Sequence, residues 1–315
     1  MTTARQTGVS LTHFGSDKLS KADIATELDL IKKRLSAEFE SDQEQLKKLN
    51  QTLNELSEFE LGRFLIKNKS LSGYWTWYII LGFNNDSIKS PLEKFIVERA
   101  PTILATQQRF AIFQSLLMKH IQSNSVVCSL PCGMMADLLT LNLSGEIAEV
   151  RFVGIDLDKA VFDLAKGLAA QLNVRTHCEF FQKDAWDLGI ENEFDVIASN
   201  GLNIYEKDDS KVVTFYKGMY RALKANGYLI CSALTPPPTI ESECEWDIEQ
   251  INKDDLITFT TIFKTILRAT WFNFRSSAKT CDQLKEAGFD NIEIHWDKQK
   301  MFPTFLARKK QMQLA

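Results

Sequence analysis

Hydrophobic and polar positions follow two different rhythms along the chain. Between residues 22 and 66, Leu and Ile recur at every third or fourth position with charges between them, which predicts a pair of amphipathic helices. From residue 125 onward, short apolar runs predict strands at 125–129, 151–156, 178–182, 194–199, 227–232, 291–296 and 302–308. The stretches between these runs predict helices at about 134–143, 159–172, 208–224 and 279–287.

Alternating strands and helices indicate a doubly wound, seven-stranded, mostly parallel α/β sheet that is covered by helices on both faces. Residues 236–279 interrupt the alternation with three prolines and a helix near 254–271. We therefore predict a flexible arm at 1–20, an N-terminal helical cap at 21–120 and a sheet domain at 121–315, in which 236–279 is a lid insertion after the fifth strand. The cap helices are expected to pack on the sheet domain, with a coiled-coil partner site as the alternative.

Composition and charge narrow the function. Hydrophobic residues make up 44% of the chain and charged residues 25%, as in ordinary globular proteins. The net charge of −4 provides no electrostatic footprint for nucleic acid. Residues 1–20 lack the apolar core of a signal peptide, and the apolar run at 74–83 is too short to span a bilayer. We expect a cytoplasmic protein with a small-molecule substrate, no nucleic-acid partner and no membrane association. We make no prediction about its oligomeric state.

The six cysteines do not form a recognisable metal motif. Cys128, Cys178 and Cys231 lie in apolar runs, where thiols usually act as small buried residues. The spacing of Cys128 and Cys132 could provide two ligands of a metal site, but no second Cys or His pair has a matching spacing. We therefore expect no metal site, and reduced thiols suit the cytoplasm.

A βαβ unit near the middle of the chain has the layout of a nucleotide site. The strand at 125–129 leads into a tight turn containing Gly133, and a helix follows. The next strand ends on Asp156, roughly 20 residues after that glycine, where an acid can accept hydrogen bonds from a pair of ribose hydroxyls.

From residue 120 to 310 the chain resembles the class I S-adenosylmethionine-dependent methyltransferases. The resemblance rests on five segments in the family's order and spacing, which are residues 129–133, 154–158, 182–186, 194–202 and 223–230. The ending at 305–309 is similar to the family's final antiparallel strand. The resemblance implies a Rossmann-like fold, S-adenosylmethionine as the cofactor and methyl transfer to a small-molecule acceptor.

The resemblance also implies where the cofactor binds. Asp156 is expected to bind the ribose, with Asp158 either as a second candidate or as the N-cap of the next helix. Asp184 is expected to bind the adenine amine beside Ala185 and Trp186, although core packing is the alternative role of Trp186. The full predicted set is Pro131, Cys132, Gly133, Asp137, Asp156, Leu157, Asp158, Asp184, Ala185, Trp186, Asn200 and Gly201.

The first motif departs from the family pattern, which is acid-x-Gly-x-Gly-x-Gly. Ser129 stands at the acid position, Pro131 at the first glycine and Met135 at the third, so that only Gly133 remains. Asp137 is a candidate to replace the missing acid opposite the cofactor's ammonium, or else an acid favoured by the helix dipole. The departure leaves a catalytically silent binding or regulatory protein as the alternative function. A nucleotide-linked dehydrogenase is a third hypothesis, disfavoured by segment 184–186 and by the reversed final strand.

Methyl transfer requires an aligned acceptor, a pocket that excludes water and, for some acceptors, a general base. None of the four histidines follows a strand at its carboxyl end, but Asn203 and Tyr205 do, and we predict a catalytic role for them. We predict that Tyr74, Trp75 and Arg109 bind the substrate, the aromatic pair as a lid and the arginine as a clamp for a carboxylate. The alternative for all three is packing of the N-terminal helices.

Overall fold

The computed structural model describes residues 19–310 except 85, 87, 144–146 and 242–243, so the predicted arm at 1–20 lies almost wholly outside the described residues. The chain divides into two compact units. Unit 1 comprises Met1–Leu104 and Glu249–Trp271, and unit 2 comprises Ala105–Ile248 and Phe272–Ala315. The division differs from the predicted boundary near residue 120, and the predicted insertion at 236–279 is shared between the two units.

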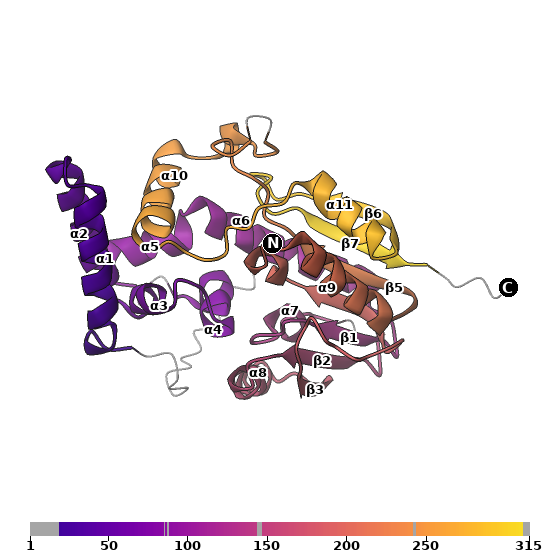
Figure 1. The fold of residues 1–315 in the computed structure, drawn as a ribbon. Helices are drawn as coiled ribbons and strands as arrows, with labels where there is room; N and C mark the ends of the chain where they lie inside the picture. The colour runs from indigo at the N-terminus through magenta and orange to yellow at the C-terminus, as the bar shows by residue number, and fades with distance from the viewer. Residues whose placement is uncertain (1–18, 85, 87, 144–146, 242–243, 311–315) are drawn as a thin grey trace. The chain divides into compact units, whose positions relative to one another are not determined.

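Unit 2 is built on a seven-stranded sheet with the strand order β3-β2-β1-β4-β5-β7-β6 (Figure 1). The first five strands of this order are parallel, and β7 runs antiparallel to both β5 and β6. This is the doubly wound, mostly parallel Rossmann-like sheet that the alternation of elements predicts. The strands are β1 (Val126–Ser129), β2 (Arg151–Asp156), β3 (His177–Gln182), β4 (Phe194–Ser199), β5 (Leu223–Ser232), β6 (Phe289–His295) and β7 (Thr304–Lys309).

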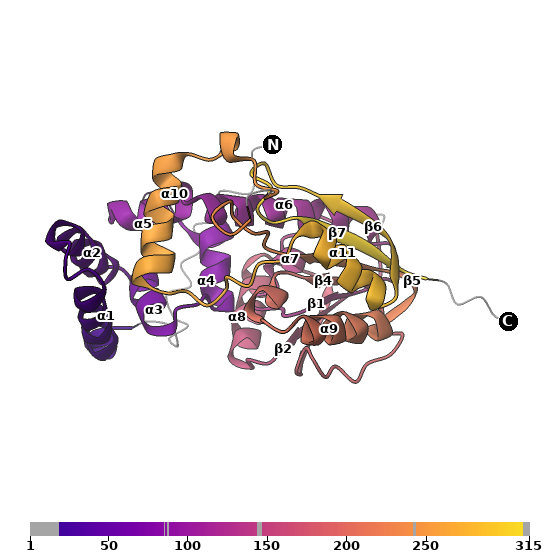
Figure 2. The ribbon, with the colours of Figure 1, turned by 45° about the horizontal axis from the view of Figure 1, so that its top comes forward.

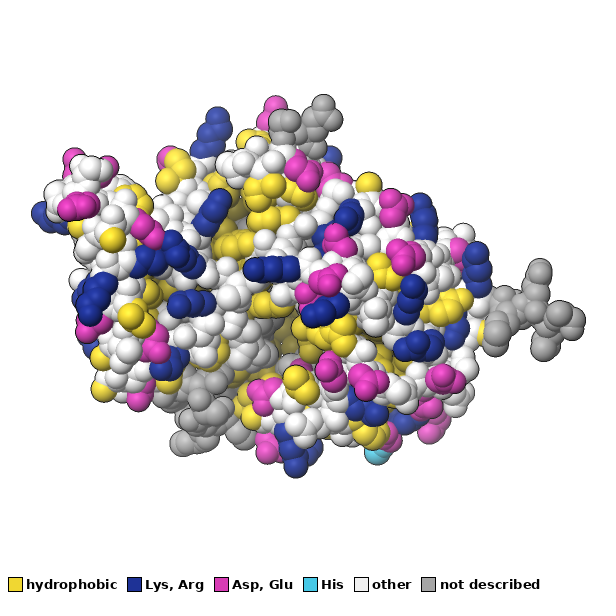
Figure 3. Space-filling model, viewed as in Figure 1, with side chains coloured by type: hydrophobic (Ala, Val, Ile, Leu, Met, Phe, Trp, Pro, Cys, Tyr) yellow, Lys and Arg dark blue, Asp and Glu magenta, His cyan; other side chains and the backbone are white. Residues whose placement is uncertain are grey.

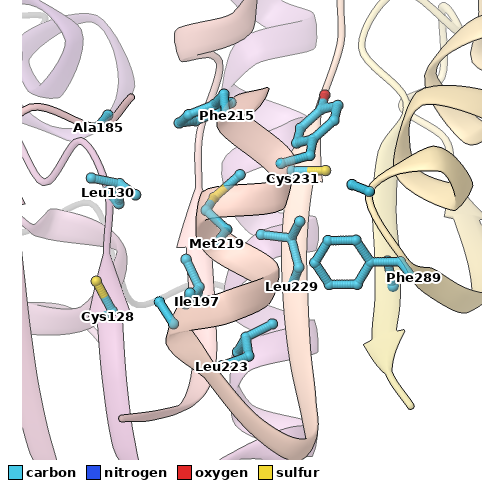
Figure 4. Close-up of a cluster of buried hydrophobic side chains, with 14 of the residues drawn as sticks. Cys128, Leu130, Ala185, Ile197, Phe215, Met219, Leu223, Leu229, Cys231 and Phe289 are labelled. Atoms are coloured by element: carbon cyan, nitrogen blue, oxygen red, sulfur yellow. The ribbon is translucent and has the colours of Figure 1, made fainter. Parts of the chain in front are cut away.

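Helices cover both faces of this sheet because the central strands alternate their buried side chains. Leu229 and Cys231 of β5 join Phe215 and Met219 of α9 in one apolar cluster, whose side chains point toward one another in Figure 4. Tyr228 points to the other face, where its ring lies 4.1 Å from that of His120 in α6. The helices of this unit are the C-terminal part of α6 (Pro101–His120), α7 (Ala136–Leu139), α8 (Ala160–Gln171), α9 (Asp209–Ala222) and α11 (Ser277–Glu286).

The helix after β1 is much shorter than the predicted range of 134–143. Met135 adopts a left-handed conformation with φ of 52°, so regular helix begins only at Ala136. Four residues later the hydroxyl of Thr140 donates to the Ala136 carbonyl at 2.6 Å, and the helix has ended. The periodic apolar pattern through this segment therefore reflects burial of a tight turn and one helical turn.

Unit 1 is helical, and part of the insertion belongs to it (Figures 1 and 2). Arg99 pairs with Asp255, Arg268 pairs with Glu38, and Arg34 donates to the Ile266 carbonyl. These contacts join the end of the insertion to the N-terminal helices. Its elements are α1 (Ala25–Glu38), α2 (Gln43–Leu56), α3 (Glu60–Asn68), α4 (Gly73–Trp77), a π-helix (Tyr78–Gly82), α5 (Pro91–Glu98), α10 (Lys253–Thr260) and a second π-helix (Thr261–Ile266). Short 3₁₀ turns occur at Ala22–Ile24 in unit 1, at Leu202–Tyr205 in unit 2, and at Ile248–Gln250, which spans the boundary between the units in the sequence.

Candidate functional site

The carboxyl ends of the parallel strands bring together most of the residues expected to bind a nucleotide. β1 lies between β2 and β4, and β3 lies beyond β2. In this register Asp156, the last residue of β2, lies opposite Gln182, the last residue of β3. Parallel strands end at a common edge, so the segments that follow β1, β2, β3 and β4 meet there.

The turn after β1 is held against the end of β2 by backbone hydrogen bonds. The Cys132 amide donates to the Ile155 carbonyl at 2.8 Å, and the Gly133 amide donates to Oδ2 of Asp156 at 2.9 Å. Gly133 and Met135 both have positive φ, at 47° and 52°. Met135 thus keeps the left-handed backbone that a glycine would favour at this position.

Asp156 organises the edge of the site. Its Oδ1 accepts from the Asp158 amide at 3.0 Å, while its Oδ2 accepts from Gly133. Burial raises the pKa of Asp156, and these backbone donors counteract that rise. Oδ1 of Asp158 accepts from the amide of Ala160, the first residue of the following helix, at 2.9 Å, while Lys159 occupies the N-cap position. Leu157, between Asp156 and Asp158, is 65% exposed, so it presents apolar surface at the same edge.

The segment after β3 divides its side chains between the surface and the core. Oδ1 of Asp184 accepts from the Trp186 amide at 2.9 Å in a tight turn. Ala185 belongs to the core cluster. Trp186 stacks on Phe215, with ring centroids 5.0 Å apart. Core packing is therefore an observed role of Trp186. Of the three residues, Asp184 is the one whose side chain lies outside the core.

Asp137 is buried and bonded to the residue that replaces the family's acid. Its carboxylate oxygens accept from the Ser129 hydroxyl at 2.8 and 3.0 Å, and one also accepts from the Leu138 amide. Burial raises the pKa of Asp137 to about 6, although these hydrogen bonds oppose the rise. Sequence reasoning had not anticipated the Ser129–Asp137 pair, since the two positions lie in a strand and in the next helix.

The segment after β4 contains an unsatisfied hydrogen-bond acceptor and the two predicted catalytic residues, which differ in solvent exposure. Oδ1 of Asn200 is buried without a hydrogen-bond partner among the described residues. The Asn203 side chain is buried and donates to the Tyr216 hydroxyl at 3.1 Å. Tyr205 is 40% exposed. Of the two predicted catalytic residues, Tyr205 therefore has the side chain that solvent or a ligand can reach.

Arg109 of α6 reaches the ends of β4 and β5 within unit 2. Its Nη1 donates to the Ser232 hydroxyl at 3.3 Å, and its guanidinium carbon lies 4.5 Å from the centroid of the Phe302 ring. A Cβ added at Gly201 would lie 3.3 Å from Nη1, so the glycine leaves room for the guanidinium. The sequence indicated the charge of Arg109, but Ser232 and Phe302 carry no signal that would have predicted this contact.

Tyr74 and Trp75 lie in unit 1 and line a pocket of about 480 Å³. Trp75 is only 2% exposed, and its ring packs edge-on against those of Tyr74 and Tyr78. The Tyr78 hydroxyl donates to Glu93 at 2.9 Å, and burial raises the pKa of Glu93. The predicted aromatic segment thus borders a pocket, with Trp75 buried in its wall.

The described part of the chain contains neither a metal-binding cluster nor a membrane-spanning helix. No group of three or more His, Cys, Asp and Glu side chains is arranged to hold a metal ion. No helix in the same residues combines the length and the apolar character needed to cross a membrane. All six cysteines are free thiols.

Comparisons with known proteins agree with this geometry. Residues 121–294 match a family model described as a methyltransferase domain. A possible exported protein from Bordetella parapertussis has 35% sequence identity and a TM-score of 0.86, over 94% of this chain and 98% of that chain. Magnesium protoporphyrin IX methyltransferase from Synechocystis PCC 6803, solved with bound SAH, has 14% identity and a TM-score of 0.52, over 76% of this chain and 94% of that chain, which shows similarity of fold. None of the curated proteins compared with the chain matches it in sequence.

Proposed function

The chain belongs to the family of methyltransferase domains, and from that premise we propose that it transfers the methyl group of S-adenosylmethionine to a small-molecule acceptor. One observation carries the proposal. Asp156 ends β2, Asp184 follows the end of β3, and Asp137 of α7 is bonded to Ser129 at the end of β1, so each of three adjacent parallel strands has an acidic group at or near its carboxyl end, the edge where doubly wound sheets bind ligands.

The residues at this edge fit the cofactor. Asp156 is an acceptor for ribose hydroxyls, Asp184 for the adenine amine, and Leu157 offers exposed apolar surface. Oδ1 of Asn200 is a buried acceptor without a partner among the described residues, and such a group favours a donor from a ligand. Asp137 supplies a carboxylate for the ammonium. We assign Pro131, Cys132, Gly133, Asp158, Ala185, Trp186 and Gly201 to the same site as its turns and walls.

When bound, S-adenosylmethionine supplies a methyl group that is activated by a positively charged sulfur. The chain's own residues have to orient the acceptor and exclude water, since an in-line displacement needs alignment more than covalent help. Tyr205 can hold or move a proton at its hydroxyl, and Asn203 positions the turn that carries it. Tyr74 and Trp75 are the aromatic residues proposed for the acceptor's apolar part.

A small acceptor is favoured over a nucleic acid. On the face seen in Figure 3, basic and acidic side chains are interspersed, without a continuous basic area. The net charge of −4 agrees with this distribution. We also propose a cytoplasmic location, in which six free thiols persist without oxidation. Cell fractionation tests the location, and recovery of the chain outside the cytoplasm would contradict it.

A catalytically silent protein is the second candidate, because proline and methionine occupy two glycine positions of the first motif. Pro131 lacks the backbone donor that glycine would offer to a ligand. The positive φ of Met135 favours the first candidate, because it preserves the backbone of the turn.

Calorimetric titration with S-adenosylmethionine and S-adenosylhomocysteine tests the proposal. We expect both to bind, and Asp156→Ala to weaken binding by roughly 1.5–3 kcal/mol through loss of hydrogen bonds to a charged acceptor. Asp163→Ala, on the exposed surface of α8, is the matched control and should bind as the wild type does. Unchanged affinity in Asp156→Ala would refute the assignment, whereas tight binding without methyl transfer to any small acceptor would favour the silent protein.

A further inference from the structure

Arg109 is a buried cation with no ion-pair partner among the described residues. Its side chain is 5% exposed, and no carboxylate of the described residues lies within ion-pair distance of it. Within the described part of the chain, its guanidinium makes one hydrogen bond, to the Ser232 hydroxyl, which is long at 3.3 Å, and its Nε has no partner there. A buried charge of this kind is costly for a fold unless something compensates for it.

Arg275 shows what a structural arginine looks like in the same unit. It is equally buried, and all three of its nitrogens are bonded. Its Nε donates to Asp209 at 2.8 Å, Nη1 to the Asn203 carbonyl at 3.0 Å and Nη2 to the Glu206 carbonyl at 2.7 Å. Packing alone therefore does not explain why Arg109 lacks such partners.

The carboxylate of Asp297 acts on Arg109 through its charge, without an ion pair, and already accepts hydrogen bonds from other groups. Its oxygens accept from the amides of Gln299, Met301 and Phe302 at 3.0, 3.3 and 2.6 Å. Burial lowers the pKa of Arg109 to about 10, so the guanidinium keeps its proton at neutral pH. The positive charge thus remains in place and only partly balanced.

The place of this cation in the fold points to a ligand. Ser232 ends β5 and Gly201 follows β4, so the guanidinium lies at the carboxyl edge of the sheet. The Phe302 ring lies over the guanidinium, and Nε, a donor of the planar fork, has no hydrogen-bond partner in the residues that the structure describes.

We propose that Arg109 binds a carboxylate of the acceptor, so that the substrate is a small organic acid. This assignment rests on the proposed methyl transfer and narrows its substrate class. A guanidinium offers parallel N–H donors that match the two oxygens of a carboxylate. In a buried site the pair gains from the low dielectric, and the acid also neutralises the charge that the fold leaves unbalanced.

The test uses benzoate and its neutral isostere benzamide as probes of the wild-type chain, with and without S-adenosylhomocysteine. Ligand-observed NMR measures both dissociation constants. We expect benzoate to bind at least tenfold more tightly than benzamide, and Arg109→Met to remove that preference. Arg109→Lys should retain part of it, because the charge remains without the planar fork. Arg308→Met, which alters an arginine bonded to Asn226 at the opposite end of β5, is the matched control.

The outcomes separate this inference from the proposed function. Equal binding of benzoate and benzamide to the wild type, or no binding of either, overturns the inference without needing any variant. Tighter binding of inorganic phosphate than of benzoate overturns the choice of a carboxylate. If benzoate shows its preference and S-adenosylhomocysteine does not bind, the anion site stands while the proposed methyl transfer fails.

Discussion

Replacing Asp137 by asparagine isolates the cost of one buried charge. The carboxylate is bonded to Ser129 and Leu138, and no Lys or Arg of the described residues pairs with it. Asparagine has nearly the same shape and keeps an oxygen that can accept from the Ser129 hydroxyl. The substitution therefore removes the ionisation of this side chain while leaving most of its packing intact.

The expected size follows from the pKa. Burial raises it from 3.8 to about 6, so the native state holds this proton more tightly than the unfolded chain. The stabilisation from the proton is complete below the unfolded pKa and is lost as pH rises through the folded pKa. With ~1.4 kcal/mol for each pKa unit, ionised Asp137 costs about 3 kcal/mol at neutral pH relative to its protonated form.

Urea unfolding of both proteins at about pH 8 and about pH 5 measures this cost. We expect the stability of Asp137→Asn relative to the wild type to be about 1.4 kcal/mol greater at the higher pH. New unsatisfied amide hydrogens would shift both values equally and leave the pH dependence unchanged. Asp163→Asn, an exposed control on α8, should show no such dependence. An equal difference at both pH values would refute the reasoning.

The same variant also tests the role of Asp137 in cofactor binding. If its carboxylate binds the ammonium of S-adenosylmethionine, Asp137→Asn should bind the cofactor more weakly by roughly 1.5–3 kcal/mol, even though the free protein becomes more stable. Calorimetry measures the affinity. Wild-type affinity in this variant would leave Asp137 with a purely structural role beneath the turn.

Two further predictions concern stability and turnover. Arg275→Met should lower the free energy of unfolding by about 3–5 kcal/mol, because it leaves Asp209, the buried Asn203 carbonyl and the part-buried Glu206 carbonyl without this partner. Denaturant titration checks the value, and an equal loss of unfolding free energy in Arg109→Met would contradict the contrast between the two arginines. Trp75→Ala should destabilise unit 1 by about 3–5 kcal/mol. It should also reduce turnover while leaving S-adenosylhomocysteine affinity unchanged, and unaltered turnover at a temperature where the variant is folded would refute a substrate role.

The centre of the sheet was predictable because β1, β2 and β4 are short, mainly apolar runs with clear limits. The predicted ranges 151–156 and 194–199 agree with β2 and β4 at both ends, and the order of elements indicated a parallel sheet. Asp156, the acid that ends β2, was recognisable from the number of residues that separate it from Gly133 in the sequence. Local sequence determines such features because a strand, the turn after it and the following helix interact mainly with one another.

The short helix after β1 and the division of the insertion were not predictable in this way. The left-handed Met135 delays the start of regular helix to Ala136, and the helix ends at Leu139, although the apolar pattern predicts helix over 134–143. Segment 249–271 follows β5 in the chain and yet clusters with the N-terminal helices. Its apolar positions show that it packs against something, but periodicity does not identify the surface that receives it.

The sequence by itself determined the doubly wound architecture, the family and the acids at the strand ends, since these depend on local patterns and fixed spacings. Only the tertiary structure decided which polar groups are satisfied. Ser129 pairs with Asp137, Asn203 bonds to Tyr216, and Arg109 lies beside Ser232 with no carboxylate of the described residues at ion-pair distance. Burial raises the free-energy cost of an unpaired polar or charged group. Which groups are buried, and which partners they meet, depends on how the elements pack, and no local sequence pattern contains that information.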